Sequence, residues 1–292
     1  MGWLEEGDHG ADRDVPLAGL TWFGLGGRAR WLAHPADPAD LGRLLQQALA
    51  SGIPVKILGG GANVLVRDDG FDGIVVRLDQ GAFRRVVFDG ERVHAGAGAD
   101  LMPLVRDCCR RGLAGLEGLA GIPGTVGGAL HMNAGGRFGD ISRCVETVDV
   151  IDTDGQPRQL SPAEVGFAYR RTNLGGRTVT GTTLRLSRDH PNTVYARFRE
   201  YWRIKKEAQP LADHSAGCVF TNPPGDSAGR LIDSAGLKGT RCGGARVSDR
   251  HANFIVADEG ATATDVLRLI ERIRQTVRRQ HGTELELEID VW

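Results

Sequence analysis

A short apolar run leads directly into three glycines at Ile53-Pro54-Val55-Lys56-Ile57-Leu58-Gly59-Gly60-Gly61-Ala62-Asn63, and Val64-Leu65-Val66 follows. The run from Ile53 to Leu58 predicts a strand, and glycine N–H groups after a strand can bind phosphate oxygens. Rossmann and P-loop sites both need a helix after the glycines. A second apolar run stands there instead, so the sequence excludes both of those nucleotide sites. A tight glycine turn between two strands is the structural alternative for this loop.

A second glycine-rich stretch follows at Gly118-Leu119-Ala120-Gly121-Ile122-Pro123-Gly124-Thr125-Val126-Gly127-Gly128-Ala129-Leu130-His131-Met132-Asn133-Ala134-Gly135-Gly136. Its glycines and Pro123 favour a loop over a strand or a helix. Such a loop can enclose a pyrophosphate, and Thr125 and Asn133 add side-chain hydrogen bonds. A flexible linker is the alternative, but apolar residues such as Ile122 and Val126 must pack. Long loops of this kind usually carry function.

The composition limits the class of protein. Glycine accounts for 42 of 292 residues, about twice the usual ~7%. The net charge of −1 provides no basic surface for a phosphate backbone, so nucleic acid is not expected as a partner. No run reaches the ~20 apolar residues of a membrane helix, and the acidic start does not resemble a signal peptide. Five cysteines without a CxxC pair favour the cytoplasm and predict no metal site.

The order of expected elements predicts an α+β fold, because strands and helices do not alternate regularly. Residues 1–17 are polar and acidic and predict a loose N-terminal tail. Residues 18–189 form one expected domain, with subdomains 18–78 and 79–189. Residues 190–292 form a second domain after the boundary near Pro191. That domain contains a basic amphipathic helix, a long helix ending at Gly282 and a final alternating strand over 285–291.

Segments along nearly the whole chain resemble the UDP-N-acetylenolpyruvoylglucosamine reductases (UDP-N-acetylmuramate dehydrogenases). The segments are Thr21–Gly27, Gly59–Asn63, Gly121–Asn133, Phe167–Arg170, Ala216–Pro223, Ala228–Ile232, Val247–Phe254 and Leu285–Glu288. The resemblance implies the FAD-binding fold of the vanillyl-alcohol oxidase type for residues 18–189. It implies a substrate-binding α+β domain for residues 190–292. Because Cys218 follows Arg170 by only 48 positions, the chain resembles the shorter subclass, which lacks an inserted tyrosine loop.

The resemblance also implies an activity. The family reduces the enolpyruvyl ether of UDP-N-acetylglucosamine to UDP-N-acetylmuramate, with NADPH as the reductant and FAD as the cofactor. This step belongs to peptidoglycan precursor synthesis and hence to cell-wall biogenesis, cell shape and cell division. The expected partner is therefore a small nucleotide-sugar substrate, without nucleic acid or membrane. The chain is expected to be a cytoplasmic monomer.

Three catalytic residues are implied by the resemblance: Cys218, Arg170 and Glu288. Cys218 stands at the proton donor's position, where the family usually has serine, and a thiol gives up its proton more readily than an alcohol. Arg170 and Glu288 are placed near the substrate carboxylate, where a guanidinium stabilises the charge of an enolate.

Each of these three residues has a structural alternative from the sequence alone. Cys218 could be a small buried apolar residue. Arg170 stands beside another arginine, and such pairs are commonly solvated. Glu288 is one of four acids on the same face of the last strand, and periodicity cannot choose among them. The other three are Glu284, Glu286 and Asp290.

The remaining site residues come from the loops and from the resemblance. The expected cofactor-binding residues are Gly59, Gly60, Gly61, Ala62, Asn63, Gly121, Ile122, Pro123, Gly124, Thr125, Gly128, Asn133, Ala134 and Gly135. The expected substrate-binding residues are Tyr169, Asn222, His251 and Lys205. Lys205 is one of three basic candidates for the UDP diphosphate on its helix, with Arg203 and Lys206, although a solvated face is the alternative for these residues.

Two other functions remain possible at this level. The first is a flavin oxidase of a small alcohol or sugar, which shares the fold and often tethers FAD through a histidine. His131 is the only candidate for such a tether in the two loops. The second is a nucleotide-sugar-binding protein of the same fold without catalysis, although an acid at position 218 together with Arg170 and Glu288 argues against it.

Overall fold

The computed structural model describes residues 8–292 and divides the chain into two compact units. The first contains Arg30–Gly60 and Asp72–Lys205, together with the described residues up to Asp14. The second contains Val15–Ala29, Gly61–Phe71 and Lys206–Trp292. The chain therefore passes from one unit to the other several times.

The bounds of the elements are as follows. The helices are α1 Pro38–Ala50, α2 Leu101–Arg110, α3 Val126–His131, α4 Pro162–Val165, α5 Pro191–Ala208, α6 Ala228–Ser234 and α7 Ala263–His281. The strands are β1 Asp12–Pro16, β2 Arg28–Ala33, β3 Val55–Ile57, β4 Val64–Leu65, β5 Phe71–Val76, β6 Val86–Asp89, β7 Arg92–Gly96, β8 Leu113–Ala114, β9 Gly135–Gly136, β10 Gly139–Asp140, β11 Val145–Ile151, β12 Pro157–Leu160, β13 Thr178–Arg185, β14 Ser187–Arg188, β15 Arg241–Cys242, β16 Ala245–Val247, β17 Ile255–Ala257 and β18 Asp290–Val291.

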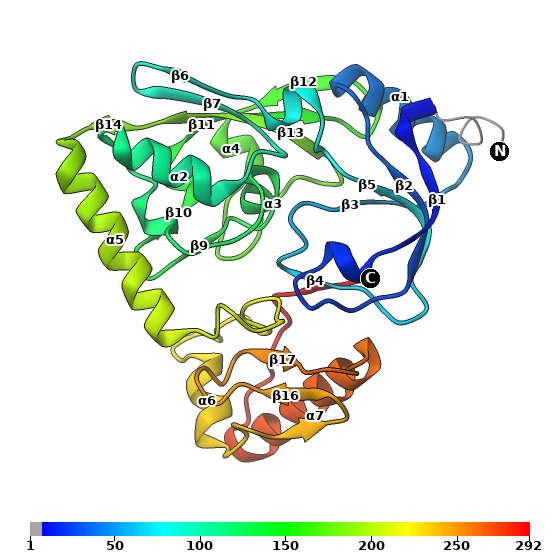
Figure 1. The fold of residues 1–292 in the computed structure, drawn as a ribbon, viewed down its shortest axis with the longest axis vertical. Helices are drawn as coiled ribbons and strands as arrows, with labels where there is room; N and C mark the ends of the chain where they lie inside the picture. Colours follow the sequence, from blue (N-terminus) through cyan, green and yellow to red (C-terminus); the bar gives the residue numbers. More distant parts are fainter. Residues whose placement is uncertain (1–7) are drawn as a thin grey trace. The chain divides into compact units, whose positions relative to one another are not determined.

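The first unit is built on an antiparallel five-stranded sheet with the order β12-β11-β13-β7-β6 (Figure 1). A turn at Asp89-Gly90, a residue pair that favours tight hairpins, joins β6 to β7. Helix α3 packs against β13 and β7, and α4 packs against β11 and β12. A capping box of Ser161 and Glu164 begins α4. The sheet and its helices enclose one continuous apolar core, against which Val55 and Ile57 pack before the first glycine loop.

A second sheet has the order β1-β2-β5-β3 and corrects the prediction for the N-terminal tail. Residues 1–7 of that tail lie outside the described residues, but Asp12–Pro16 form β1 at the edge of this sheet. The prediction of a loose tail is therefore wrong for β1. Its side chains are mostly exposed, and an edge strand needs only backbone hydrogen bonds on one side. The polar composition of this segment therefore gives no sign of a strand.

The second glycine-rich stretch also differs from its prediction as a loop. Residues 126–131 form α3, and the Thr125 hydroxyl accepts a hydrogen bond from the Gly128 N–H at 3.4 Å as its N-cap. Val126, Ala129 and Leu130 lie on the buried side of this short helix. Because helical stability in proteins comes mainly from packing, these contacts outweigh the cost of two glycines.

The second unit packs α6 and α7 with the small sheet β15-β16-β17 (Figure 1). Helix α7 begins with a capping box of Thr262 and Asp265 and ends at Gly282 in the left-handed conformation, as expected for this residue type. The final strand is shorter than predicted. Only Asp290–Val291 are a regular strand, paired in parallel with β4, while Leu287 forms an isolated bridge with Phe220.

The units do not follow the single boundary predicted near residue 190. Helix α5 belongs to the first unit up to Lys205, whereas Phe23 and Leu65 belong to the core of the second unit. Packing between distant segments decides this division, and composition along the chain does not reveal it. Among residues 8–292, no helix is both long and apolar enough to cross a membrane.

Candidate active site

Gly59 and Gly60 of the first glycine loop meet the second loop inside the first unit. A Cβ atom added to Gly60 would lie 2.7 Å from the Cα of Gly124, and one added to Gly59 would lie 2.7 Å from the Thr125 hydroxyl oxygen. Gly124 has a φ of +97°, which side chains rarely adopt. Both loops therefore need glycine here because their backbones touch. A turn between strands, the structural alternative for the first loop, does not require this contact with the second.

The backbone groups of these loops fit a phosphate-containing cofactor. Among the described residues, the N–H groups of Gly59, Gly60, Gly124 and Thr125 donate no hydrogen bond to the protein. All four residues are half-buried rather than exposed. N–H groups without protein acceptors in a glycine cradle are the donors that bind phosphate oxygens elsewhere. The arrangement therefore fits the pyrophosphate of FAD.

Asn133 connects the second loop to the predicted catalytic arginine. It is 5% exposed, has a φ of +46°, and donates from Nδ2 to the carbonyl of Ala168 at 3.0 Å. Its Oδ1 atom is buried and accepts no hydrogen bond from residues 8–292. An unused buried acceptor costs free energy, so a donor from a bound group fits this position.

Arg170 is held in a defined orientation next to this loop. Its φ is +56°, its Nη2 donates to the carbonyl of Gly135 at 2.8 Å, and its guanidinium lies 5.2 Å from the centre of the Tyr169 ring. Arg170 is half-buried, whereas Arg171 is exposed. The alternative of two solvated arginines therefore applies to Arg171 and not to Arg170. Tyr169 itself is exposed at 55% and can meet a ligand.

Lys205 lies beside Arg170, and its stem passes between two glycines of the second loop. A Cβ atom on Gly121 would lie 3.0 Å from the Lys205 Cδ, and one on Gly136 would lie 4.0 Å from its Cε. Burial, and the charge of Arg170, lower the pKa of Lys205 to about 8. The other two basic candidates of α5 differ, because Arg203 pairs with Glu200 at 2.8 Å and Lys206 is exposed.

Cys218 lies in an extended segment of the second unit. This segment pairs on one side with the segment of Phe254 and on the other with the segment of Glu288. It forms an isolated bridge with Phe254, while the N–H of Val219 donates to the carbonyl of Asn253 at 2.8 Å. Cys218 is half-buried and follows Gly217, which has a φ of +77°. The backbone of this residue is therefore fixed on both sides, and its thiol is not part of the fully buried core.

Asn253 is a positioning residue that the sequence did not single out. It is 3% exposed, and its amide both accepts from the N–H of Phe220 at 3.0 Å and donates to the carbonyl of Phe220 at 2.8 Å. These two bonds anchor the segment that carries Cys218. Only the spatial pairing of residues 33 positions apart reveals them.

The replacement Asn253→Ala is expected to lower the free energy of unfolding by roughly 2–5 kcal/mol, because it leaves two buried backbone groups of Phe220 unpaired. Urea unfolding measures this loss. The control Asn192→Ala changes an exposed asparagine and should cost less than about 0.5 kcal/mol. Equal stability of the two variants would show that the bonds of Asn253 do not hold this segment.

Glu288 lies next to Cys218 in the same backbone ladder. Its N–H donates to the carbonyl of Val219 at 2.8 Å, and its carbonyl accepts from the Asn63 side chain at 3.0 Å. The residue is half-buried, whereas the other three acids of this segment are exposed: Glu284, Glu286 and Asp290. The structure therefore separates Glu288 from the three acids that periodicity left equivalent.

Asn222 and His251 lie elsewhere in the second unit. The side-chain oxygen of Asn222 accepts from the N–H of Ala228 at 3.0 Å, at the start of α6. His251 is half-buried, and the centre of its imidazole ring lies 4.9 Å from the centre of the Phe254 ring. Burial, and the charge of Lys238, lower the pKa of His251, so a neutral imidazole is favoured. Phe254 links His251 to Cys218, since it is also the bridge partner of Cys218.

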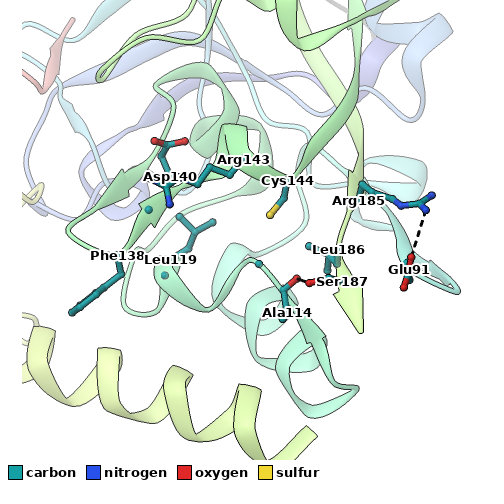
Figure 2. Close-up of a pocket in the computed structure, with 13 residues that line it drawn as sticks. Glu91, Ala114, Leu119, Phe138, Asp140, Arg143, Cys144, Arg185, Leu186 and Ser187 are labelled. Carbon is teal, nitrogen blue, oxygen red and sulfur yellow. Dashed lines mark hydrogen bonds and ion pairs between the residues drawn. The ribbon is translucent and has the colours of Figure 1, made fainter. Parts of the chain in front are cut away.

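A separate cavity of about 510 Å³ lies beside the ends of the second loop, and none of the predicted site residues lines it. Figure 2 shows Leu119, near the start of the second glycine-rich stretch, and Phe138, which follows that stretch, at the cavity with Cys144. Burial raises the pKa of Cys144 to about 11. Burial likewise raises the pKa of both Cys108 and Cys109 to about 12. These three cysteines therefore belong to the apolar core, and their thiols are poor nucleophiles at neutral pH.

Thiol reactivity should divide the five cysteines into two groups. Cys218 and Cys242 are half-buried and the other three are buried, and only a thiolate reacts quickly. A maleimide added to the native protein at neutral pH should therefore label two positions, and denaturation should release the other three. Peptide mass spectrometry identifies the sites. Rapid native labelling of Cys144 would contradict the burial of its thiol.

Two protein families match consecutive parts of the chain. The family "FAD binding domain" matches residues 29–161, and "UDP-N-acetylenolpyruvoylglucosamine reductase, C-terminal domain" matches residues 209–292. The first match confirms the predicted FAD-binding fold.

Similar proteins cover nearly all of the chain. The UDP-N-acetylenolpyruvoylglucosamine reductase 2 of Symbiobacterium thermophilum is 45% identical, over 96% of this chain and 91% of its own length. The corresponding reductase of Moorella thermoacetica is 44% identical, over 95% and 91%. The crystal structure of UDP-N-acetylenolpyruvylglucosamine reductase (MurB) from Thermus caldophilus has a TM-score of 0.84 at 42% identity, covering 97% of this chain and 98% of that one. The chain belongs to the family of UDP-N-acetylenolpyruvoylglucosamine reductases.

Proposed function

We propose that this chain reduces the enolpyruvyl ether of UDP-N-acetylglucosamine to UDP-N-acetylmuramate, with NADPH as the reductant and FAD as the cofactor. The observation that carries this proposal is the match to such reductases along nearly the whole chain, at 45% identity. The same match disfavours the oxidase alternative. The product is a precursor of peptidoglycan, so the reaction serves cell-wall synthesis.

Cys218, Arg170 and Glu288 are the proposed catalytic residues. Addition of hydride to the methylene carbon of the enolpyruvyl group leaves an enolate, whose charge spreads onto the carboxylate. Arg170 stabilises this charge, and its bond to Gly135 keeps the guanidinium oriented without reorganisation during the reaction. The Cys218 thiol then donates its proton to the adjacent carbon. Glu288 is proposed to lie near the carboxylate of the substrate, as Arg170 does.

The proposed FAD site consists of the two glycine loops. FAD supplies the transfer of hydride from NADPH to the substrate. The residues that hold it are Gly59, Gly60, Gly61, Ala62, Asn63, Gly121, Ile122, Pro123, Gly124, Thr125, Gly128, Asn133, Ala134 and Gly135. The unpaired N–H groups and the contact of Gly60 with Gly124 support this assignment.

Substrate binding is proposed for Tyr169, Asn222, His251 and Lys205. A net charge of −1 provides no basic field for a nucleic-acid backbone, so the proposed partner is the small nucleotide-sugar substrate alone. We further propose that the protein acts as a monomer in the cytoplasm.

A steady-state assay separates the reductase from the oxidase. Purified protein with NADPH is mixed with the enolpyruvyl ether without oxygen, and NADPH consumption and the nucleotide-sugar product are measured. Consumption of one NADPH per UDP-N-acetylmuramate formed supports the proposal. Turnover that requires oxygen and leaves the enolpyruvyl ether unchanged would support the oxidase instead.

A further inference from the structure

The amine of Lys205 is buried in the first unit without a hydrogen-bond acceptor from the described residues, 8–292. No carboxylate of these residues forms an ion pair with it, and the charge beside it is the like charge of Arg170. A buried ammonium without acceptors costs several kcal/mol. The amine therefore either loses its proton or needs an added anion.

The surroundings of Lys205 favour an anion. The guanidinium of Arg170 acts on the amine as a second positive charge, and Arg170 is itself fixed by its bond to Gly135. The stem of Lys205 lies close against Gly121, where an added Cβ would come within 3.0 Å of its Cδ atom, and in ordinary contact range of Gly136. The neighbouring basic residues of α5 do not compete with Lys205 for this anion, since Arg203 pairs with Glu200 and Lys206 is exposed.

We propose that Lys205 and Arg170 bind one oxyanion of the substrate together, and that the Lys205 amine takes up a proton when this anion binds. The inference rests on the proposed function for the identity of the substrate. The oxyanion is a carboxylate or a phosphate oxygen, both of which accept charge-assisted hydrogen bonds from such a pair. The uptake makes Lys205 a pH-dependent binding residue instead of a permanent cation.

The direction of the pH dependence follows from the two protonation states. In the free protein, burial and Arg170 hold the pKa of Lys205 at about 8, whereas a bound anion stabilises the ammonium and raises that pKa. Substrate affinity is therefore constant below pH 8. Above pH 8 it falls about tenfold per pH unit, because each unit lowers the protonated fraction of the free protein tenfold.

Lysine-selective isotope labelling tests the free protein directly. The sequence contains four lysines, Lys56, Lys205, Lys206 and Lys238, so NMR of the FAD-loaded protein with ¹³C at lysine Cε gives four signals. The variants Lys205→Arg and Lys206→Arg assign two of them. Lys205 should titrate near pH 8, well below the pKa of about 10.4 of an unperturbed lysine side chain. Titration of Lys205 near that unperturbed value would overturn the inference, whether or not the enzyme is active.

Calorimetry with two probes tests the proton uptake and identifies the oxyanion. At pH 8, binding in buffers of different ionisation enthalpy should show uptake of about half a proton. Uptake with UDP alone assigns the diphosphate, and uptake with UDP-N-acetylmuramate but not UDP assigns the carboxylate. Binding of both probes without proton uptake would overturn the proposal, while the loss of turnover alone would count against the proposed function.

Variants of Lys205 separate its charge from a structural role. Lys205→Met should raise KM at pH 7 by roughly 10- to 100-fold and remove the rise of KM above pH 8. Lys205→Arg should restore binding and keep KM flat above pH 8, because guanidinium stays charged. The control Lys206→Met should retain the wild-type profile. An unchanged pH profile in Lys205→Arg would contradict the proposal.

Discussion

Replacement of Cys218 by alanine is expected to slow the oxidation of the reduced flavin by the enolpyruvyl ether about 10²- to 10⁴-fold, the usual contribution of a positioned acid. FAD content and the reduction of the flavin by NADPH should stay close to those of the wild type. The reason is that Cys218 lies in the second unit, in the ladder with Phe254 and Glu288. The two glycine backbones that meet, Gly60 and Gly124, lie in the first. Stopped-flow absorbance measures the two half-reactions separately.

Two control variants define this result. Cys218→Ser should remain active, since the family usually has serine at this position. Cys242→Ala removes the other half-buried thiol of the second unit and should leave both half-reactions unchanged. Wild-type flavin oxidation in Cys218→Ala would remove Cys218 from the mechanism.

The second large effect is expected for FAD binding in Gly60→Ala. The new Cβ would lie 2.7 Å from the Cα of Gly124, and backbone cannot move aside as a side chain can. Overpacking of this kind costs about 1–3 kcal/mol, which corresponds to roughly 5- to 150-fold weaker FAD binding. Titration of the FAD-free protein with FAD measures the affinity.

A matched control is available at Gly19. No atom lies within 4 Å of a Cβ added there, so Gly19→Ala should retain wild-type FAD affinity. Equal affinity of Gly60→Ala and the wild type would show that contact between the two loops is not required for the cofactor site.

Much of the fold could be predicted because local patterns and tertiary packing agree. The Asp89-Gly90 hairpin and the capped helices α1, α4 and α7 appear where turn and cap residues predict them. The strand after Gly59–Asn63 is also present as β4. Sequence reasoning failed where the decisive contacts lie far away in the chain. Strand β1 is held by pairing rather than by apolar side chains, and α3 by packing despite its glycines.

The same limit applies to the candidate site. The glycine loops could be identified because their composition has few structural uses. Periodicity could not separate Glu288 from its neighbouring acids, because they differ only in burial. Lys205 belongs to a helix that looks like an ordinary solvated basic surface, yet its amine is buried beside Arg170. Asn253 has its partner 33 positions away, which no local pattern indicates.

The most direct test of the central claim is anaerobic stopped-flow absorbance of the NADPH-reduced protein mixed with the enolpyruvyl ether of UDP-N-acetylglucosamine. The absorbance band of oxidised flavin should return rapidly, and UDP-N-acetylmuramate should be formed in equal amount. A flavin that stays reduced until oxygen is admitted, with the enolpyruvyl ether unchanged, would contradict the assignment as a reductase of this substrate.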